Sequence, residues 1–107
     1  MKDLKIILKD DVLKVTLPPE IDHHTVQGVR KEIDEALYLH RPSELVISLD
    51  NVSFMDSSGL GLILGRYTKA KDLGAAIRLQ NPDKRTEKIL SFAGIERIIP
   101  IEYTGKL

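Results

Sequence analysis

The hydrophobic positions change their spacing along the chain, and each change marks a new predicted element. Residues 12–17 alternate between apolar and polar side chains, which predicts a half-buried strand. Residues 4–9 have the composition of a strand, and the acidic pair at 10–11 is a turn signal. The two segments are therefore predicted to form an antiparallel pair. Pro18 and Pro19 end the second strand, because proline has no N–H to donate to a sheet.

The next apolar residues recur three and four positions apart, which is the spacing of one face of a helix. This stripe consists of Val26, Val29, Ile33 and Leu37. It predicts a helix from about His23 to Leu39, with the charged side chains on the opposite, solvated side. Asp22 precedes it and is predicted to be the N-cap, since a carboxylate accepts hydrogen bonds from the first backbone N–H groups.

The middle of the chain predicts strand, loop, helix and strand in turn. The short apolar run 44–49 is typical of a strand buried on both faces, and residues 50–55 are predicted to be a loop. A second helix is predicted from Ser57 or Ser58 to Leu73, with Gly74 as the residue just past its end. Residues 76–79 are predicted to be a further short strand.

The C-terminal part predicts one more helix and one more strand. Residues 81–83 punctuate the chain and cap a third helix over 86–93, which stops at Gly94. The residues expected to face inward are Ile89, Leu90 and Phe92. A last strand is predicted over 97–101, interrupted by Pro100.

The order ββαβαβαβ predicts an α/β fold, because helices between strands give right-handed crossovers and a mixed, mostly parallel sheet. With 107 residues, the chain is predicted to form a single domain over 1–107.

Composition removes several classes of function. Sixteen basic and sixteen acidic residues give a formal net charge of zero, so no electrostatic attraction to nucleic acid or to an anionic membrane is expected. The absence of cysteine excludes disulfides and thiolate metal sites. The N-terminal residues lack the apolar core of a signal peptide, and no window approaches 18 apolar residues. A cytoplasmic location is therefore expected.

The segment 53–67 is the most informative part of the chain. Its run Asp56-Ser57-Ser58 places a carboxylate and two hydroxyls where a strand gives way to a helix. Any one of these side chains can cap the helix, but one cap leaves the second hydroxyl without a purpose. The helix also contains Gly59, Gly61 and Gly65, and a glycine inside a helix costs about 1 kcal/mol relative to alanine. Local stability alone does not account for this segment.

The second helix suggests a docking surface. At about 100° per residue, one face is predicted to pack on the sheet. That face consists of Leu60, Ile63, Leu64, Tyr67 and Ala70. Leu62 lies roughly opposite, between Gly61 and Gly65, and an exposed apolar residue among small residues indicates a docking patch. The alternative interpretation is an ordinary exposed leucine, which needs no partner.

Enzymatic alternatives have little support. A Ser57–His24–Asp22 nucleophile arrangement would need the two loops to meet, and the elbow pattern G-x-S-x-G lacks its first glycine. A nucleotide-binding or nucleotide-hydrolysing domain would need a dinucleotide fingerprint or a P-loop, and neither pattern is present. The adjacent pair His23-His24 is too isolated to predict a metal site. No cofactor and no metal are expected.

A serine at this corner can instead be the substrate of a kinase. The dipole and free N–H groups of the helix N-terminus tolerate an anion, so a phosphate on Ser57 would not disturb the fold. The phosphate would add about −1.5 to −2 charges beside Asp56 and near Leu62. The hypothesis is that phosphorylation of Ser57 changes binding and leaves the fold unchanged.

Two segments together resemble a known family. Residues 53–67 resemble the phosphorylation-site segment of bacterial anti-sigma factor antagonists, the STAS domain family, and residues 20–25 resemble a conserved loop of the same family. The similarity extends to Phe92-Ala93-Gly94-Ile95 near the end of the chain, and it is greatest to the members that act in sporulation. Pro18-Pro19 departs from the family pattern, where a glycine is expected.

The resemblance implies a partner switch without enzymatic activity. The unphosphorylated protein would bind an anti-sigma factor that is also a serine kinase, and so release a sigma factor. The kinase would phosphorylate Ser57, and a PP2C-type phosphatase would reset the switch; the alternative is a STAS antagonist in a general stress pathway. Ser58 would then cap the helix. The residues expected to touch the partner are Asp22, His23, His24, Thr25, Asp56, Ser58, Gly59, Leu60, Gly61, Leu62 and Arg66, of which Leu60 is also a candidate for the core.

Overall fold

The chain begins with the predicted antiparallel hairpin. In the computed structural model, which describes residues 2–105, β1 (Lys5–Lys9) pairs with β2 (Val12–Thr16), and Leu8 lies opposite Leu13. Asp10 and Asp11 connect the strands with φ of 52° and 65°. Aspartate tolerates this left-handed conformation better than most residues, and two such residues form the tight turn whose twist suits a hairpin.

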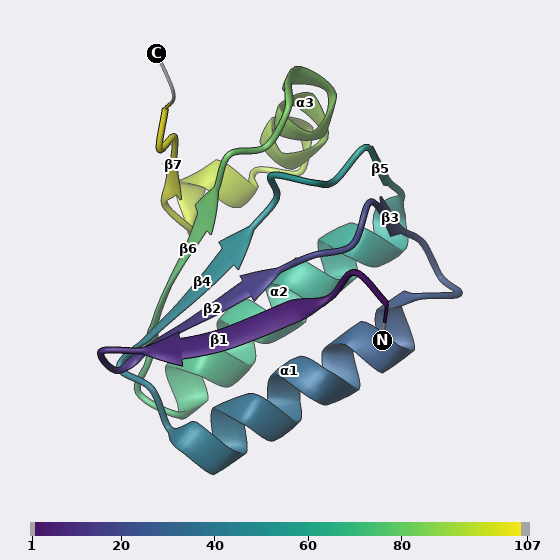
Figure 1. Ribbon diagram of the computed structural model, residues 1–107. Coiled ribbons are helices and arrows are strands. Elements are labelled where there is room, and N and C mark those ends of the chain that lie inside the picture. Colours follow the sequence, from purple (N-terminus) through teal and green to yellow (C-terminus); the bar gives the residue numbers. More distant parts are fainter. Residues whose placement is uncertain (1, 106–107) are drawn as a thin grey trace.

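The main sheet has five strands in the order β1-β2-β4-β6-β7 (Figure 1). The added strands are β4 (Glu44–Ser48), β6 (Ala76–Gln80) and β7 (Ile101–Glu102), and from β2 onward all neighbours are parallel. The predicted mixed, mostly parallel α/β sheet is therefore confirmed. β4 lies at its centre and is buried from Leu45 to Ser48, as its continuous apolar run predicted.

Three helices complete the fold. The helices α1 (Val26–His40) and α2 (Ser57–Asp72) lie side by side on one face of the sheet and run in the same direction (Figure 1). The shorter α3 (Lys84–Phe92) lies near the end of the sheet to which β4 and β6 point. The predicted stops at Gly74 and Gly94 are confirmed, since these glycines have φ of 77° and 76°.

Two very short strands were not predicted. β3 (Glu20–Ile21) and β5 (Phe54–Met55) pair in parallel with each other and form a separate two-stranded sheet. β5 falls inside the segment 50–55 that was predicted to be a loop. Two residues are too few to show any hydrophobic period, so the sequence pattern could not reveal this pairing.

The predicted start of the first helix was wrong by three residues. The helix begins at Val26 rather than His23, because the carboxylate and carbonyl of Asp22 hold a turn that precedes it. Thr25 occupies the N-cap position, and its side chain makes no capping hydrogen bond to the helix. Asp22 therefore stabilises the turn and is not the helix cap.

The predicted last strand over 97–101 was also largely wrong. Residues Ile95–Arg97 form a short 3-10 helix, and β7 begins only at Ile101. The N–H of Ile99 donates to the carbonyl of Ile95 at 2.9 Å, so both apolar side chains turn inward over one helical turn. An apolar pair four residues apart fits a helical turn as well as a strand.

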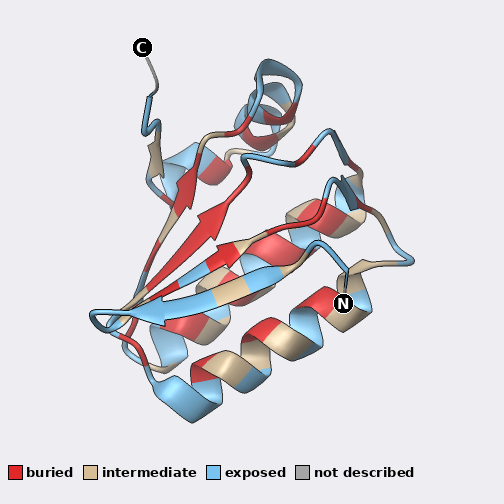
Figure 2. Ribbon diagram, in the orientation of Figure 1, coloured by how far each residue is buried: buried red, intermediate tan, exposed pale blue. Residues whose placement is uncertain are grey.

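The core fills the space between the sheet and the two long helices (Figure 2). The predicted inward stripe of α1 is confirmed for Val29, Ile33 and Leu37, which are fully buried, while Val26 is half-buried. Phe92 contradicts the prediction, since it is 96% exposed. In α3 the buried residues are Thr86 and Leu90, four positions apart, and Phe92 lies about 200° around the helix from Leu90.

No helix within residues 2–105 combines the length and the apolar character that spanning a bilayer requires.

Candidate functional site

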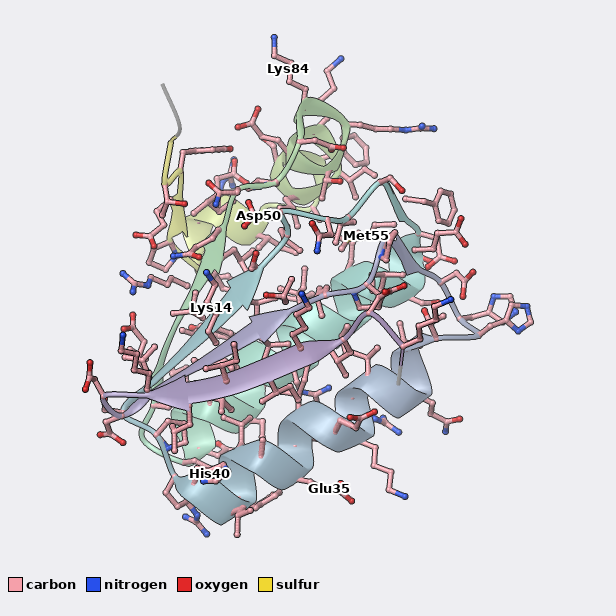
Figure 3. All side chains as sticks on the ribbon, viewed as in Figure 1. Lys14, Glu35, His40, Asp50, Met55 and Lys84 are labelled. Atoms are coloured by element: carbon pink, nitrogen blue, oxygen red, sulfur yellow. The ribbon has the colours of Figure 1, made fainter. Side chains whose placement is uncertain are left out.

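The small sheet of β3 and β5 brings the two predicted functional loops together. Ile21 lies opposite Met55 in this sheet, and the N–H of Asp56 donates to the carbonyl of Ile21 at 3.2 Å. Figure 3 shows Met55 at this junction, where α1 and α2 both begin (Figure 1). The loop Asp22–Thr25 and the corner at Ser57 are therefore at the same end of the molecule.

Asp56 is the cap of α2. Its Oδ1 accepts a hydrogen bond from the N–H of Ser58 at 2.8 Å, and its backbone is extended, as an N-cap requires. The expectation that Ser58 caps the helix was wrong. Ser58 is the second residue of the helix, whereas Asp56 lies just outside it. The side chain of Asp56 therefore reaches the free N–H group of Ser58 more readily.

Ser57 is the first residue of α2 and is exposed. Within residues 2–105, its hydroxyl makes no hydrogen bond to another group of the protein. Because Asp56 already caps the helix, the structure does not need this hydroxyl. Ser57 thus combines an accessible hydroxyl with a position at the positive end of a helix.

The neighbouring loop is held by its own hydrogen bonds. Asp22 Oδ1 accepts from the N–H of His24 at 2.9 Å and from the N–H of Thr25 at 3.2 Å. The Thr25 hydroxyl closes the turn by donating to the carbonyl of Glu20 at 3.2 Å and accepting from the N–H of Asp22 at 3.1 Å. His23 and His24 are exposed, with ring centroids 3.9 Å apart. The loop presents both imidazoles outward on a fixed turn.

These contacts do not assemble a catalytic triad. The carboxylate of Asp22 serves backbone N–H groups of its own loop, and no hydrogen bond joins Ser57 to His24 among residues 2–105. A nucleophilic serine needs a base within hydrogen-bond reach, and the base needs a group that orients it. Residues 2–105 also contain no group of three or more histidine, aspartate or glutamate side chains that could hold a metal ion.

Gly59 is required for the shape of the corner. A Cβ at this position would lie 2.3 Å from Met55 Cγ, which is too close, and 3.1 Å from Ile21 Cγ2, which is a tight contact. The helix can therefore press against the small sheet only because residue 59 has no side chain. Gly59 is buried, and the partner contact predicted for it stays a prediction.

Leu62 is not an exposed docking residue. It is 5% exposed and belongs to the core, whereas Leu64, predicted to face the sheet, is 39% exposed. The helical-face prediction assumed that α2 has one buried side. α2 packs against the sheet and also against α1, so two of its sides are buried and Leu62 points toward α1.

The glycines beside Leu62 line a groove between α1 and α2. Gly61 is exposed and Gly65 is half-buried, and together with Ser58 they form the α2 side of a hollow of about 310 Å³. Gln27 and Arg30 form the α1 side. We call this hollow the α1–α2 groove.

Arg66 lies at the inner side of the α1–α2 groove. It is 5% exposed, and its Nε is 3.0 Å from Oδ1 of Asp34 on α1. The two charges are close, but neither atom lies in a hydrogen-bonding direction from the other, and Nη1 is buried without any hydrogen-bond partner. Burial lowers the pKa of Arg66, Asp34 opposes this effect, and Arg30 adds to it. The structure places Arg66 between the two helices, and the partner contact predicted for it stays a prediction.

An apolar surface between α2 and α3 was not predicted from the hydrophobic period. Leu60, Ile89 and Phe92 line an open hollow of about 540 Å³, together with Lys88 and Ser91. Leu60 is half-buried, so it is in contact with the core and also reaches this surface. The signal in the sequence was the spacing of Phe92 from Leu90, which places the two side chains on different sides of α3.

Comparison with known proteins identifies relatives of the whole chain. The STAS domain profile matches residues 4–106. Over 90 residues the chain is 41% identical to the anti-sigma F factor antagonist of Paenibacillus polymyxa, covering 84% of this chain and 77% of that protein. Over 89 residues it is 29% identical to the anti-sigma-B factor antagonist of Bacillus subtilis strain 168, covering 83% of this chain and 80% of that protein.

Solved structures agree with these sequence relatives. The unphosphorylated form of the anti-sigma factor antagonist SpoIIAA superposes with a TM-score of 0.83 at 26% identity, covering 96% of this chain and 89% of that chain. The phosphorylated form of the Bacillus protein SpoIIAA gives a TM-score of 0.76 at 26% identity, covering 96% and 92%. The chain therefore belongs to the STAS domain family and is of the anti-sigma factor antagonist type.

Proposed function

We propose that this protein is a phosphorylation-controlled partner switch, which acts as a single STAS domain over residues 1–107. Its unphosphorylated form binds an anti-sigma factor that is also a serine kinase, and this binding releases the sigma factor. The kinase phosphorylates Ser57, the complex dissociates, and a PP2C-type phosphatase restores the active form. The protein itself catalyses no reaction and works in the cytoplasm.

The observation that carries this proposal is the exposed hydroxyl of Ser57 on a helix already capped by Asp56. The hydroxyl is accessible to a kinase, and no hydrogen bond among residues 2–105 uses it. A relative of similar structure, SpoIIAA, has been solved in both an unphosphorylated and a phosphorylated form. This supports phosphorylation as the control step.

The contact surface is proposed to surround Ser57. It includes the exposed imidazoles of His23 and His24 on the neighbouring turn, and Gly61 on the first turns of α2. Asp22, Thr25, Asp56 and Gly59 hold the shape of this surface, and Ser58, Leu60 and Arg66 lie at its margins. Leu62 is left out because it is buried.

A sporulation pathway is proposed rather than a general stress pathway. The identity to an anti-sigma F factor antagonist is 41%, compared with 29% to an anti-sigma-B factor antagonist. Binding tests with both kinds of anti-sigma factor decide between them. Tighter binding to a sigma-B type anti-sigma factor would move the protein to the stress pathway.

The decisive experiment is incubation with the anti-sigma factor kinase and ATP, followed by mass spectrometry of the digested protein. We expect one phosphate, on Ser57, and none in the Ser57→Ala variant. Ser58→Ala is the matched control, because it removes the neighbouring hydroxyl and leaves Ser57 intact. Phosphate on Ser58 alone would overturn the assignment, and ATP hydrolysis by the purified protein without kinase would contradict a purely regulatory role.

A further inference from the structure

The α1–α2 groove contains a buried cation whose hydrogen bonds are incomplete. Arg66 is 5% exposed, and the structure gives its Nη1 no hydrogen-bond partner. It forms an ion pair with Asp34, whose Oδ1 lies 3.0 Å from Nε but outside hydrogen-bonding direction. Buried charged groups are normally both paired and hydrogen-bonded, so an arginine in this state indicates a missing acceptor.

A second cation faces the same part of the groove. Arg30 extends from α1 and lines the hollow of about 310 Å³ together with Arg66. The adjoining part of the groove, farther along both helices, is lined by the same two arginines and by two carboxylates and two amines, those of Asp34, Glu35, Lys31 and Lys69. The hollow nearest the helix N-termini thus has two arginines and no carboxylate in its lining, whereas both carboxylates line the adjoining part. Both helix dipoles also place their positive ends there.

Close packing does not explain the two glycines of this groove. A Cβ added at Gly61 or at Gly65 would meet nothing within 4 Å, in contrast to Gly59. Each glycine in a helix interior nevertheless costs about 1 kcal/mol relative to alanine. The space that they leave open is thus space in the groove, and it exposes the helix backbone beside Arg30 and Arg66.

We propose that the α1–α2 groove is a binding site for a phosphate-type oxyanion. The anion lies between Arg30 and Arg66, over the backbone of Gly61 and Gly65, with the hydroxyl of Ser58 as an additional donor. A guanidinium binds phosphate through two parallel N–H donors, and a turn of the Arg66 side chain toward the groove would bring its buried Nη1 to this acceptor. Water can fill a polar hollow as well, but it brings no negative charge to Arg30, whereas Arg66 already has Asp34 as a counter-ion.

The test is a titration of the isotopically labelled, full-length protein with inorganic phosphate, monitored by nuclear magnetic resonance. Potassium chloride at matched ionic strength is the reference, because simple screening acts on all exposed charges. We expect saturable shifts of the backbone amides of Gly61 and Gly65 and of the Arg66 side-chain N–H, in the millimolar range or tighter. The amides of Gly74 and Gly94, which lie outside the groove, are expected to stay in place.

The variant that tests the charge is Arg30→Gln, since Arg30 is exposed and its replacement leaves the ion pair of Arg66 intact. We expect phosphate binding to weaken at least about tenfold. Arg85→Gln, at an exposed position of α3, is the matched control and should bind as the wild type does. A second titration with phenyl phosphate separates a site for free phosphate from one that also accepts a phosphate monoester.

Three outcomes would overturn the proposal. The first is the absence of saturable shifts at Gly61 and Gly65, and the second is equal shifts with chloride. The third is equal weakening by Arg30→Gln and Arg85→Gln, which would mean general attraction to a basic surface.

Discussion

Neighbouring residues at the start of α2 have separate roles. Asp56 holds the helix by accepting the N–H of Ser58 at 2.8 Å, while the hydroxyl of Ser57 next to it stays exposed. This division makes it possible to change one residue without changing the other. A modification of Ser57 therefore acts on whatever approaches the helix end, and a substitution of Asp56 acts on the helix itself.

Substitution of Asp56 by alanine should destabilise the protein by about 0.5–2 kcal/mol, since loss of an N-cap has an effect of this size. Ser57→Ala removes a hydroxyl that has no partner within residues 2–105 and should change the free energy of unfolding far less. Urea denaturation followed by circular dichroism measures both. Equal destabilisation by the two substitutions would mean that Ser57 shares in the capping.

Ser57→Asp should weaken binding to the anti-sigma factor by at least about tenfold, because it places a fixed negative charge beside Asp56 in the proposed contact surface. The thermal midpoint should stay near that of the wild type, since a carboxylate is favoured in the first turn of a helix. Calorimetric titration gives the affinity, with Ser57→Asn as the uncharged control. A collapsed melting transition would instead identify a structural role for residue 57.

At the scale of the elements, α2 is the helix on which the sequence and the structure differ most. The sequence could predict its bounds, because the strand before it, the capping residues and Gly74 are all local signals. It could not predict which side chains are buried, since that depends on α1 as well as on the sheet. Leu62 was misplaced for this reason, and Arg66 acquired a partner from α1 that no local pattern indicates.

The difference between local signals and tertiary contacts also explains the other wrong predictions. Strands of two residues, such as β3 and β5, form only because distant segments meet, and the turn at Asp22 replaces the first helical residues by hydrogen bonds of its own side chain. The family resemblance joined the Asp22 loop to the Ser57 corner, and the structure supplies the physical link, which is the pairing of Ile21 with Met55. The groove with its incompletely paired arginine was visible only in three dimensions.

Substituting the three glycines of α2 by alanine should change the stability of the protein in opposite directions. Gly61→Ala and Gly65→Ala should each stabilise the protein by up to about 1 kcal/mol, because both sites are open and alanine is the better helix former. Gly59→Ala should destabilise it, because its Cβ would meet Met55 Cγ at 2.3 Å. Thermal unfolding of the three variants measures the signs. Destabilisation by all three substitutions would mean that other atoms occupy the space beside Gly61 and Gly65 in solution.

The contribution to stability of a hydrogen bond between α3 and the segment after β7 should depend on pH. The Tyr103 hydroxyl donates to Oε2 of Glu87, and this hydrogen bond raises the pKa of Tyr103 to about 12. Because the unfolded tyrosine ionises near pH 10, the contribution of this pair to stability is complete below about pH 10 and is lost as the pH rises to about 12. Absorbance titration of tyrosinate should show this late ionisation, and Glu87→Gln should bring it to lower pH. An unchanged titration curve in Glu87→Gln would contradict the assignment.

At the scale of the whole molecule, the buried core and the proposed contact surface lie in different parts of the fold. The sheet and the inner faces of α1 and α2 form one core (Figure 2), while the Ser57 corner and the loop Asp22–Thr25 lie at one end of it (Figure 1). The lining of the α1–α2 groove begins at the first turns of both helices, at the same end. The formal net charge is zero, so a single phosphate of about −1.5 to −2 charges changes the balance of the entire protein.

Phosphorylation should therefore alter charge and association without altering shape. The phosphorylated protein should migrate faster toward the anode on a native gel and elute from size-exclusion chromatography at the same volume as the unphosphorylated protein. Mixed with the anti-sigma factor, only the unphosphorylated form should elute earlier as a complex. Co-elution of the phosphorylated form to the same extent would contradict the proposed release.

The open sites at Gly61 and Gly65 also make this protein a convenient reporter. The sequence contains no cysteine, so Gly61→Cys or Gly65→Cys would introduce a unique thiol, and nothing within 4 Å obstructs its Cβ. A fluorophore attached there would lie at the edge of the α1–α2 groove, one or two helical turns from Ser57. A single labelled protein would then show by its emission when an anion or a partner protein arrives, and the change could be followed in real time during phosphorylation.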